Sequence, residues 1–461
     1  MTVDRRLPTS LVLIALLVAS VGSLGAPLVT SVAGEYDVSL ATAQWTLTVT
    51  LLTGAVATPL LGRLGSGPRR RTTTLATLGV VAAGSVCTVV PGSLPLLIAG
   101  RAAQGVGLGL APLLMATARE ELDEGRATRV IAMLSVATTA AIGLGYPAAG
   151  LLTDAGGVEA AYTAGLALTA AALVVGVRTL PPPRSAEQQA PPVDWVGAAL
   201  LGAALAAVLV ALGDDALWSG HPRAATAALV GGLLLLAAWL GVERRVRAPL
   251  VDLRALRHPV VLRADLAMFV GGTAMYLLLT LATRYLQTPP SVGYGFGLNT
   301  FEAGLVLVPF SVAGFVAGRL VPRVVRRIGP SATVAWSVVL VAVGFLVFAV
   351  GRPVVAGPVV AVTLLGLGVG AVSASMPAMI LAVTPHRETA GAMSVNQVVR
   401  SVGFSLGSAV GGLVLSMQVL DDGFPEPVGY VWASAVGGAL AVAAAAIVVL
   451  GRPRPVEDLS G

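Results

Sequence analysis

The sequence predicts an all-α polytopic membrane protein, and three observations support this fold class. Apolar residues make up 56% of the chain and charged residues only 11%, with a mean hydropathy of +0.87, whereas a soluble domain carries roughly 25% charged residues. The apolar residues form about fourteen runs, each near the roughly 20 residues that a helix needs to cross a bilayer. All 29 lysine or arginine positions are arginines, most of them in the breaks between the runs.

The first apolar run, 10–32, follows Arg5 and Arg6. It is too long for the apolar core of a signal peptide, so we interpret it as a retained span. The other runs long enough to cross a membrane lie at 41–62, 73–92, 94–118, 130–153, 160–180, 194–213, 222–242, 262–286, 302–322, 331–350, 354–383, 393–416 and 428–450.

The arginines also predict the orientation. The N-terminus, the even-numbered loops and the C-terminus hold 24 arginines, and the odd-numbered loops hold only Arg223 and Arg352. Because cytoplasmic loops are enriched in basic residues, we expect both termini in the cytoplasm and the chain in the cytoplasmic membrane. Topology and contact with anionic membrane lipid account for the net charge of +6, so no nucleic-acid partner is expected.

Several chemistries are excluded by what the sequence lacks. Cys87 is the only cysteine, which excludes disulfides and cysteine metal sites. The sequence has no P-loop, HExxH or CxxC motif. We therefore expect no enzyme, no metal, no other cofactor and no ATP-binding domain in the chain.

Two hydrophilic stretches divide the runs into groups of six, two and six. We expect an N-terminal six-helix bundle over 1–180, a Pro-rich cytoplasmic linker over 181–193 and two additional transmembrane helices over 194–242. A basic cytoplasmic loop over 243–261, a C-terminal six-helix bundle over 262–450 and a cytoplasmic tail over 451–461 follow. The sequence Gly-Arg-Leu ends a run before an arginine-rich loop at both 62–64 and 318–320, as parallel repeats in transporters produce.

Four short motifs resemble those of one transporter family. They are Arg101-Ala-Ala-Gln104-Gly105 in the fourth run, Gly62-Arg63-Leu-Gly with Arg69, Arg70 and Arg71 after the second, Gly143-Leu-Gly145-Tyr146-Pro147-Ala-Ala-Gly150 in the fifth, and Asn396-Gln397-Val-Val-Arg400 in the thirteenth. With fourteen runs, they resemble the major facilitator superfamily, specifically its fourteen-span drug/proton antiporter branch. The chain departs from that branch at Ser66 and Val18, where aspartates are usual.

The resemblance implies a major facilitator fold and roles for three polar residues. Arg101, Gln104 and Arg400 are candidates for relaying protons or holding a polar group. Burying a guanidinium in a membrane costs at least roughly 2.5–3.5 kcal/mol and usually marks an interior-facing function. Each arginine also has an alternative role. Arg101 is then a structural arginine bonded to helix carbonyls, and the side chain of Arg400 reaches the membrane surface.

The arginine loop and the glycines are candidates for conformational roles. Arg63, Arg69, Arg70 and Arg71, after Gly62, are expected to latch the two halves together, or else only to set topology. The Gly105/Gly109 and Gly403/Gly407 spacings favour close helix packing. The motif with Gly143, Gly145, Pro147 and Gly150 predicts a bent fifth span.

Candidate residues for the substrate cavity are polar, aromatic or thioether side chains within the runs. Such side chains tolerate ligands of varied shape, and few carboxylates occur midway through the runs, so a neutral or largely apolar ligand is expected. The candidates are Ser20, Ser23, Gln44, Trp45, Met115, Tyr146, Tyr276, Met376 and Gln397.

The sequence thus predicts a secondary transporter whose partners are a small molecule, membrane lipid and the proton gradient. The resemblance implies proton-coupled efflux of hydrophobic or amphipathic compounds. The alternative is a transporter that imports or exports a single metabolite, because fold alone does not decide between the two.

Overall fold

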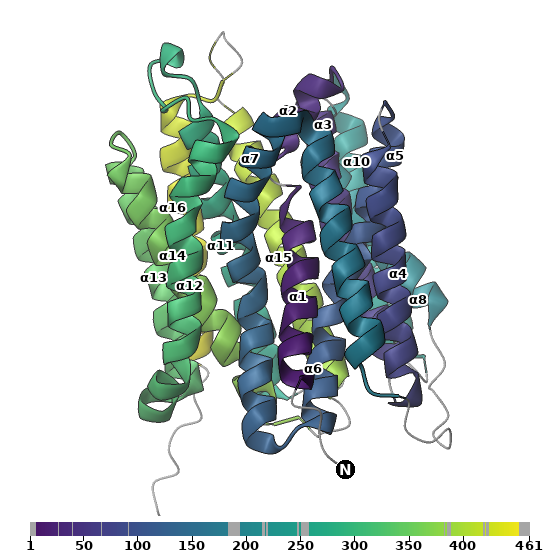
Figure 1. The fold of residues 1–461 in the computed structure, drawn as a ribbon. Coiled ribbons are helices and arrows are strands. Elements are labelled where there is room, and N and C mark those ends of the chain that lie inside the picture. Colours follow the sequence, from purple (N-terminus) through teal and green to yellow (C-terminus); the bar gives the residue numbers. More distant parts are fainter. Residues whose placement is uncertain are drawn as a thin grey trace, which may run out of the picture.

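The computed structural model is a bundle of long helices that run along a common direction (Figure 1). It describes residues 6–25, 27–38, 40–65, 67–90, 92–182, 194–213, 217, 220–246, 249, 258–381, 383–384, 389–417, 420 and 424–450. The predicted linker, basic loop and tail therefore lie largely outside the described residues. The all-α membrane fold predicted from the apolar runs is confirmed.

The helices of the first half are α1 (Leu7–Ser23), α2 (Val29–Glu35), α3 (Leu40–Leu64), η1 (Gly67–Arg69), α4 (Arg70–Val89), α5 (Leu94–Gly105), η2 (Val106–Gly109), α6 (Leu110–Glu121) and α7 (Glu124–Thr179). Next come α8 (Trp195–Gly213) and α10 (Pro222–Glu243). The second half contains α11 (Pro259–Gln287), η4 (Pro290–Val292), α12 (Thr300–Ile328), α13 (Pro330–Gly351), α14 (Ala356–Leu381), α15 (Thr389–Ser416) and α16 (Pro427–Leu450).

By length and apolar composition, 11 helices of the described residues are able to cross a membrane, and α1 and α8 provide shorter apolar helices. The helix α7 covers two predicted runs, which meet at Gly156 and Gly157. Gly157 has a φ of 69°, in the left-handed region that favours glycine. The count of fourteen spans stays a prediction.

One predicted span was wrong in its extent. The run 10–32 is not one helix, because α1 ends at Ser23 and α2 begins at Val29. A side-chain carbon at Gly25 would lie 2.0 Å from a guanidinium nitrogen of Arg101. The chain therefore leaves the helix where a residue without a side chain allows that arginine to approach.

The helices pack in two groups that contact each other along two seams. The N-terminal group is α1 and α3–α7, and the C-terminal group is α11–α16. One seam joins α7 to α12, and the other joins α3 to α15. The helices α8 and α10 pack on each other, and α8 also contacts both α3 and α15.

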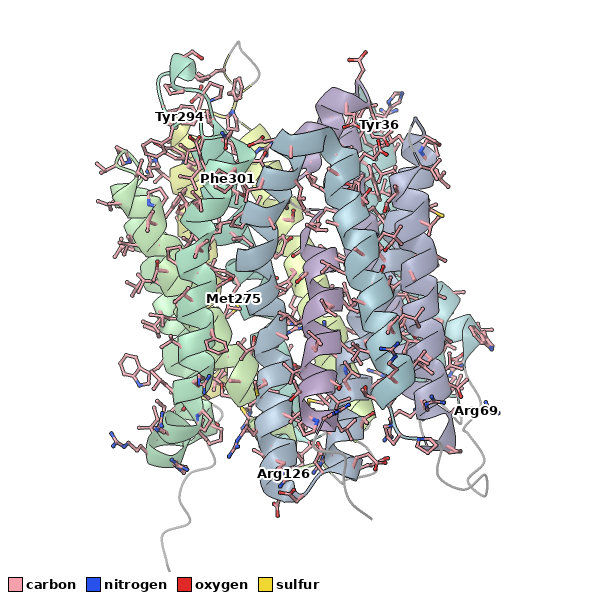
Figure 2. The ribbon with its side chains drawn as sticks, viewed as in Figure 1. Tyr36, Arg69, Arg126, Met275, Tyr294 and Phe301 are labelled. Carbon is pink, nitrogen blue, oxygen red and sulfur yellow. The ribbon has the colours of Figure 1, made fainter. Side chains whose placement is uncertain are left out.

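The two ends of the bundle differ in composition (Figure 2). Arg69 and Arg126 lie at one end, and Tyr36, Tyr294 and Phe301 lie at the other. We call these the arginine-rich end and the opposite end.

Candidate functional site

Arg101 is fully buried, and it contacts three helices. Its Nε donates to the carbonyl of Thr46 at 3.2 Å, and its terminal nitrogens donate to the carbonyls of Val21 at 3.1 Å and Gly22 at 3.3 Å. It also donates to Gln104 Oε1 at 2.7 Å. The ring of Tyr162 lies 5.9 Å from its guanidinium carbon.

These contacts give Arg101 a structural task at the end of α1. The carbonyls of Val21 and Gly22 belong to the last turn of that helix, where backbone acceptors have no partner within the helix. In a membrane interior, water cannot supply the missing donors. Arg101 supplies them from α5.

Gln104 extends this network into α4. Its Nε2 donates to the hydroxyl of Ser85 at 3.0 Å and to that of Thr88 at 3.3 Å, and it is itself buried. Arg101 and Gln104, predicted as a pair, are therefore brought together by the structure. Ser85 and Thr88 were missed, although two hydroxyl residues three positions apart on an apolar helix form a polar stripe that signals such a partner.

The glycine-proline motif of the fifth predicted span lies between the two groups of helices. A side-chain carbon at Gly145 would lie 2.2 Å from Ser23 Oγ of α1. One at Gly150 would lie 2.4 Å from Cα of Phe301, at the start of α12. Pro147 lies beside Gly304 of α12, where an added carbon would be 2.7 Å from the proline nitrogen. Gly143 lies in α7, but its surroundings lie outside the described part of the chain.

The arginines of the loop after α3 contact their own group of helices. Arg70 forms an ion pair with Glu120 at the end of α6. Arg71 donates to the carbonyls of Leu180 and Val177, both at 3.2 Å. Gly62 and Arg63 lie in the last turns of α3, and Arg69 is exposed. In the described part of the chain, the hydrogen bonds and the ion pair of Arg70 and Arg71 stay within the first group of helices, whereas the sequence hypothesis was a latch across the two groups.

The predicted small-residue faces are places of close helix approach. Side-chain carbons at Gly105 and Gly109 would lie 2.3 Å from the Thr50 carbonyl and 3.0 Å from Thr58 Cα, both in α3. Gly403 and Gly407 pack in the same way on the backbone of α11. Both faces therefore serve contacts within one group of helices.

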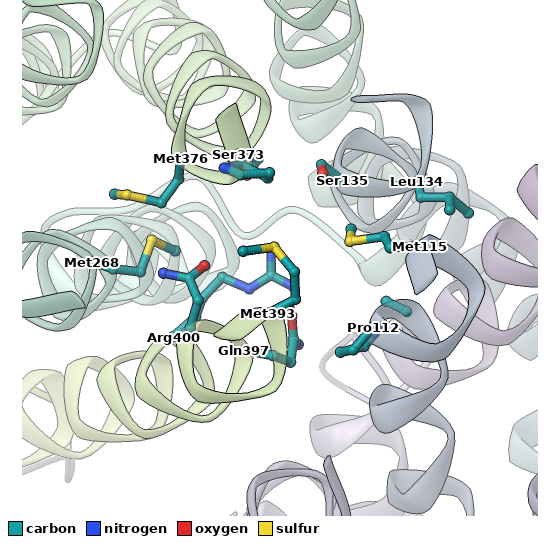
Figure 3. Close-up of a pocket in the computed structure, with 13 residues that line it drawn as sticks. Pro112, Met115, Leu134, Ser135, Met268, Ser373, Met376, Met393, Gln397 and Arg400 are labelled. Carbon is teal, nitrogen blue, oxygen red and sulfur yellow. Dashed lines mark hydrogen bonds between the residues drawn. The ribbon is translucent and has the colours of Figure 1, made fainter. Parts of the chain in front are cut away.

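A small cavity of about 30 Å³ lies between the two groups of helices. This volume has room for about two water molecules. The walls come from α6 and α7 on one side and from α11, α14 and α15 on the other (Figure 3). The lining residues are Ala111, Pro112, Met115, Leu134, Ser135, Met268, Ser373, Met376, Pro377, Met393, Asn396, Gln397 and Arg400.

Predicted and unpredicted residues share this cavity. Met115, Met376, Gln397 and Arg400 were candidates from the sequence, and Arg400 donates a hydrogen bond to the Gln397 side chain. Of the nine methionines, four line the cavity: Met115 and Met376, with Met268 and Met393, which were missed. The arginine is half-buried, and among the described residues it forms no ion pair.

Ser20, Ser23, Trp45, Tyr146 and Tyr276, which were also cavity candidates, are not among the residues that line this cavity. Ser20 and Ser23 bond to the backbone of α1, and Ser23 also donates to the Ala141 carbonyl of α7 at 3.1 Å. Tyr146 is buried in the main hydrophobic core, and Tyr276 stacks on Phe404 with ring centroids 5.3 Å apart. The last two candidates are Trp45, which is half-buried in α3, and Gln44, whose side chain lies outside the described residues.

The sequence profile of the Major Facilitator Superfamily matches residues 11–408 and 289–461. The chain belongs to the major facilitator superfamily. It is thus a multi-pass membrane protein and a secondary transporter of a small molecule, and the family is one of transporters rather than enzymes.

Named relatives of this major facilitator transporter include drug exporters. The chain is 27% identical to the multidrug efflux pump LfrA of Mycolicibacterium smegmatis, over 90% of this chain and 82% of that protein. It is 26% identical to the tetracenomycin C resistance and export protein of Streptomyces glaucescens, over 87% and 73% of the two chains.

Solved structures of low sequence identity share the fold. The human organic anion transporter MFSD10 superposes with a TM-score of 0.63 at 19% identity, over 98% of this chain and 99% of that one. The POT family transporter PepTSo superposes with a TM-score of 0.65 at 16% identity, over 97% of each chain. The predicted major facilitator fold is therefore confirmed, whereas the fourteen-span branch stays a prediction.

Proposed function

We propose that this transporter exports hydrophobic or amphipathic small molecules across the cytoplasmic membrane by alternating access, in exchange for protons. The cavity between the two groups of helices carries this proposal. Its four methionines offer an apolar, polarisable wall that adapts to ligands of different shape. The similarity to named drug exporters over most of the chain supports export of such compounds.

We further propose that the arginine-rich end faces the cytoplasm, with both termini on that side. The distribution of arginines between alternate loops supports this orientation. In this proposal, the two groups of helices rock against each other along the α7–α12 and α3–α15 seams, and the cavity lies between them. The helices α8 and α10 are then the two additional helices of a fourteen-span arrangement.

Arg400 supports a prediction about the charge of the ligand. Arg400 lines the cavity, and none of the described residues that line it carries a carboxylate. A fixed positive charge repels a cationic ligand and attracts an anionic one. Neutral and anionic amphipathic compounds are therefore the expected substrates.

A second candidate function is transport of a single polar or anionic metabolite. Gln397, Asn396 and Arg400 place amide and guanidinium groups together on one wall of the cavity. Such a cluster is able to recognise one carboxylate-bearing ligand with high selectivity. Substrate range separates the two candidates.

The test is accumulation of three lipophilic dyes, one neutral, one anionic and one cationic, in efflux-deficient cells that express the protein. We expect lower accumulation of the neutral and anionic dyes, and a protonophore should abolish the difference. Accumulation is compared with that in the same efflux-deficient cells without the protein.

Unchanged accumulation of every dye, with the protein present in the membrane, contradicts drug export and directs the search to individual metabolites. Lower accumulation that persists with the protonophore contradicts proton coupling. Export of the cationic dye alone contradicts the role assigned to Arg400.

A further inference from the structure

Asp265 is a buried carboxyl group inside the membrane-spanning part of the chain. It lies in the second turn of α11, a helix that is apolar enough to cross a bilayer. Its exposed fraction is 3%. Acidic residues in such positions are rare and usually functional, because an isolated charge is costly away from water.

The hydrogen bonding of Asp265 is incomplete. Asn396 of α15 donates from Nδ2 to Oδ1 at 2.9 Å, and Oδ2 has no hydrogen-bond partner among the described residues. A neutral amide is the only side-chain partner of Asp265 among the described residues, so the contact leaves a negative charge on the carboxylate uncompensated. The carboxyl group is therefore in a site that favours its protonated form.

No base on the surrounding helices pairs with Asp265 in the described part of the chain. The helices α13 and α14 contain no acid or base, and α16 contains only Tyr430, near the opposite end. Arg400 is the only ionisable residue of α15, and it bonds to Gln397. His386, Arg387 and Glu388, before α15, lie outside the described residues. The remaining ionisable residues of α11 and α12 are Arg263, Tyr276, Arg284, Tyr285, Glu302, Arg319, Arg323, Arg326 and Arg327.

Asn396 connects this carboxyl group to the cavity. Its side chain holds Asp265, and it also lines the cavity together with Met268, which follows Asp265 by about one turn of α11. The cavity lies between the two groups of helices, which is the space that alternating access opens to each side in turn. Only the side chain of Asn396 thus separates a proton on Asp265 from the cavity, whose exposure to water on each side of the membrane changes during transport.

We propose that Asp265, held by Asn396, is the proton-binding group that couples this transporter to the proton gradient. The inference rests on the proposed proton-driven export. A hydronium ion in the outward-facing cavity gives its proton to the carboxylate: one hydronium O–H bond breaks and leaves water, one carboxyl O–H bond forms, and the negative charge of Asp265 is neutralised. In the inward-facing state the same bond breaks, and the proton passes to cytoplasmic water.

The test uses the full-length protein in lipid vesicles and compares the wild type with the Asp265→Asn and Asp265→Glu variants. We expect Asp265→Asn to lower pH-gradient-driven uphill transport of a dye by at least about tenfold while exchange of dye between the two sides stays within about twofold. Asp265→Glu should retain coupling with a shifted pH profile. Asp194→Asn, the same change at a carboxylate that caps α8 away from the cavity, is the matched control and should retain coupling.

A second measurement reports the proton without transport. Infrared difference spectra across a pH titration show the carbonyl band of a protonated carboxylic acid, and Asp265→Asn should remove one titrating band. If that band is lost but wild-type protein exports no dye, the proposed substrate class fails and the proton site stands. The proposal on Asp265 is overturned if Asp265→Asn keeps the band or full uphill transport. Equal loss of uphill transport and exchange in the Asn and Glu variants also overturns it, because that pattern indicates a purely structural role.

Discussion

Replacement of Arg101 by alanine should destabilise the transporter, because it removes the hydrogen-bond donors that satisfy the carbonyls in the last turn of α1. Four hydrogen bonds are lost: to the carbonyls of Val21, Gly22 and Thr46 and to the Gln104 side chain. Side-chain hydrogen bonds between membrane helices contribute about 0.6–1.7 kcal/mol each, so the loss is roughly 2–7 kcal/mol. The last-turn carbonyls of α1 are then left in a site that water does not fill.

The assay is thermal unfolding of the purified protein in detergent, followed by the loss of monodisperse protein on a sizing column. We expect R101A to unfold several degrees below wild type and to reach the membrane in smaller amounts. R101K keeps the charge, but a single ammonium cannot span the same acceptors, so it should fall between the two. Gln104→Ala removes three hydrogen bonds, one from Arg101 and two to Ser85 and Thr88, but it leaves the carbonyls of α1 bonded, so it should cost less than R101A.

Wild-type stability in R101A would refute the structural argument. The proton-relay hypothesis for Arg101 has its own test: normal transport by R101A and R101K at equal membrane abundance would contradict it. A stable protein that fails to couple would instead assign the residue a role in the transport cycle and not in the fold.

Three further results are expected from the packing and the charges. Gly304→Ala should lower the free energy of unfolding by about 1–3 kcal/mol, because its new carbon would lie 2.7 Å from the Pro147 nitrogen. Gly241→Ala, with open space around it, is the control. Equal thermal unfolding midpoints of the two variants would contradict tight packing at the α7–α12 seam. In a double-mutant cycle, Arg70→Gln and Glu120→Gln should show a coupling free energy below about 1 kcal/mol, since Glu120 is 54% exposed. A coupling free energy several times larger would contradict the assignment of this contact as a surface ion pair. Arg400→Gln should shift dye preference from anionic towards cationic by about fivefold or more, measured as relative efflux rates, and an unchanged preference would exclude electrostatic selection by this residue.

The fold was predictable because the bilayer imposes it on the sequence. A run of apolar residues has few alternatives to a spanning helix in lipid, and arginines mark the breaks. The extent of the first span was not predictable in the same way. Its helix ends where Gly25 meets Arg101, a contact between positions far apart in the chain, and hydropathy carries no information about such a pair.

The candidate site was predictable only in part for the same reason. The pairing of Arg101 with Gln104 lies within one helix, so its spacing is visible in the sequence. The contact of Asp265 with Asn396 joins α11 to α15 across 131 positions. Side chains such as Met268 and Met393 line the cavity only because two groups of helices meet there, and the same side chains would be ordinary core residues elsewhere.

The position of α8 has a consequence for compounds that travel within the lipid. Leu201 and Leu205 of α8, with Trp239 of α10, pack in one hydrophobic cluster with Ala55 of α3 and Val395 of α15. This cluster shields the α3–α15 seam from the acyl chains at that depth.

The α7–α12 seam has no such cover within the described residues, and its flanks carry exposed apolar side chains such as Leu151 and Val312. A lipophilic molecule that diffuses sideways through a leaflet therefore meets one shielded flank and one bare flank. The helices α8 and α10 make the lateral approach to this transporter one-sided.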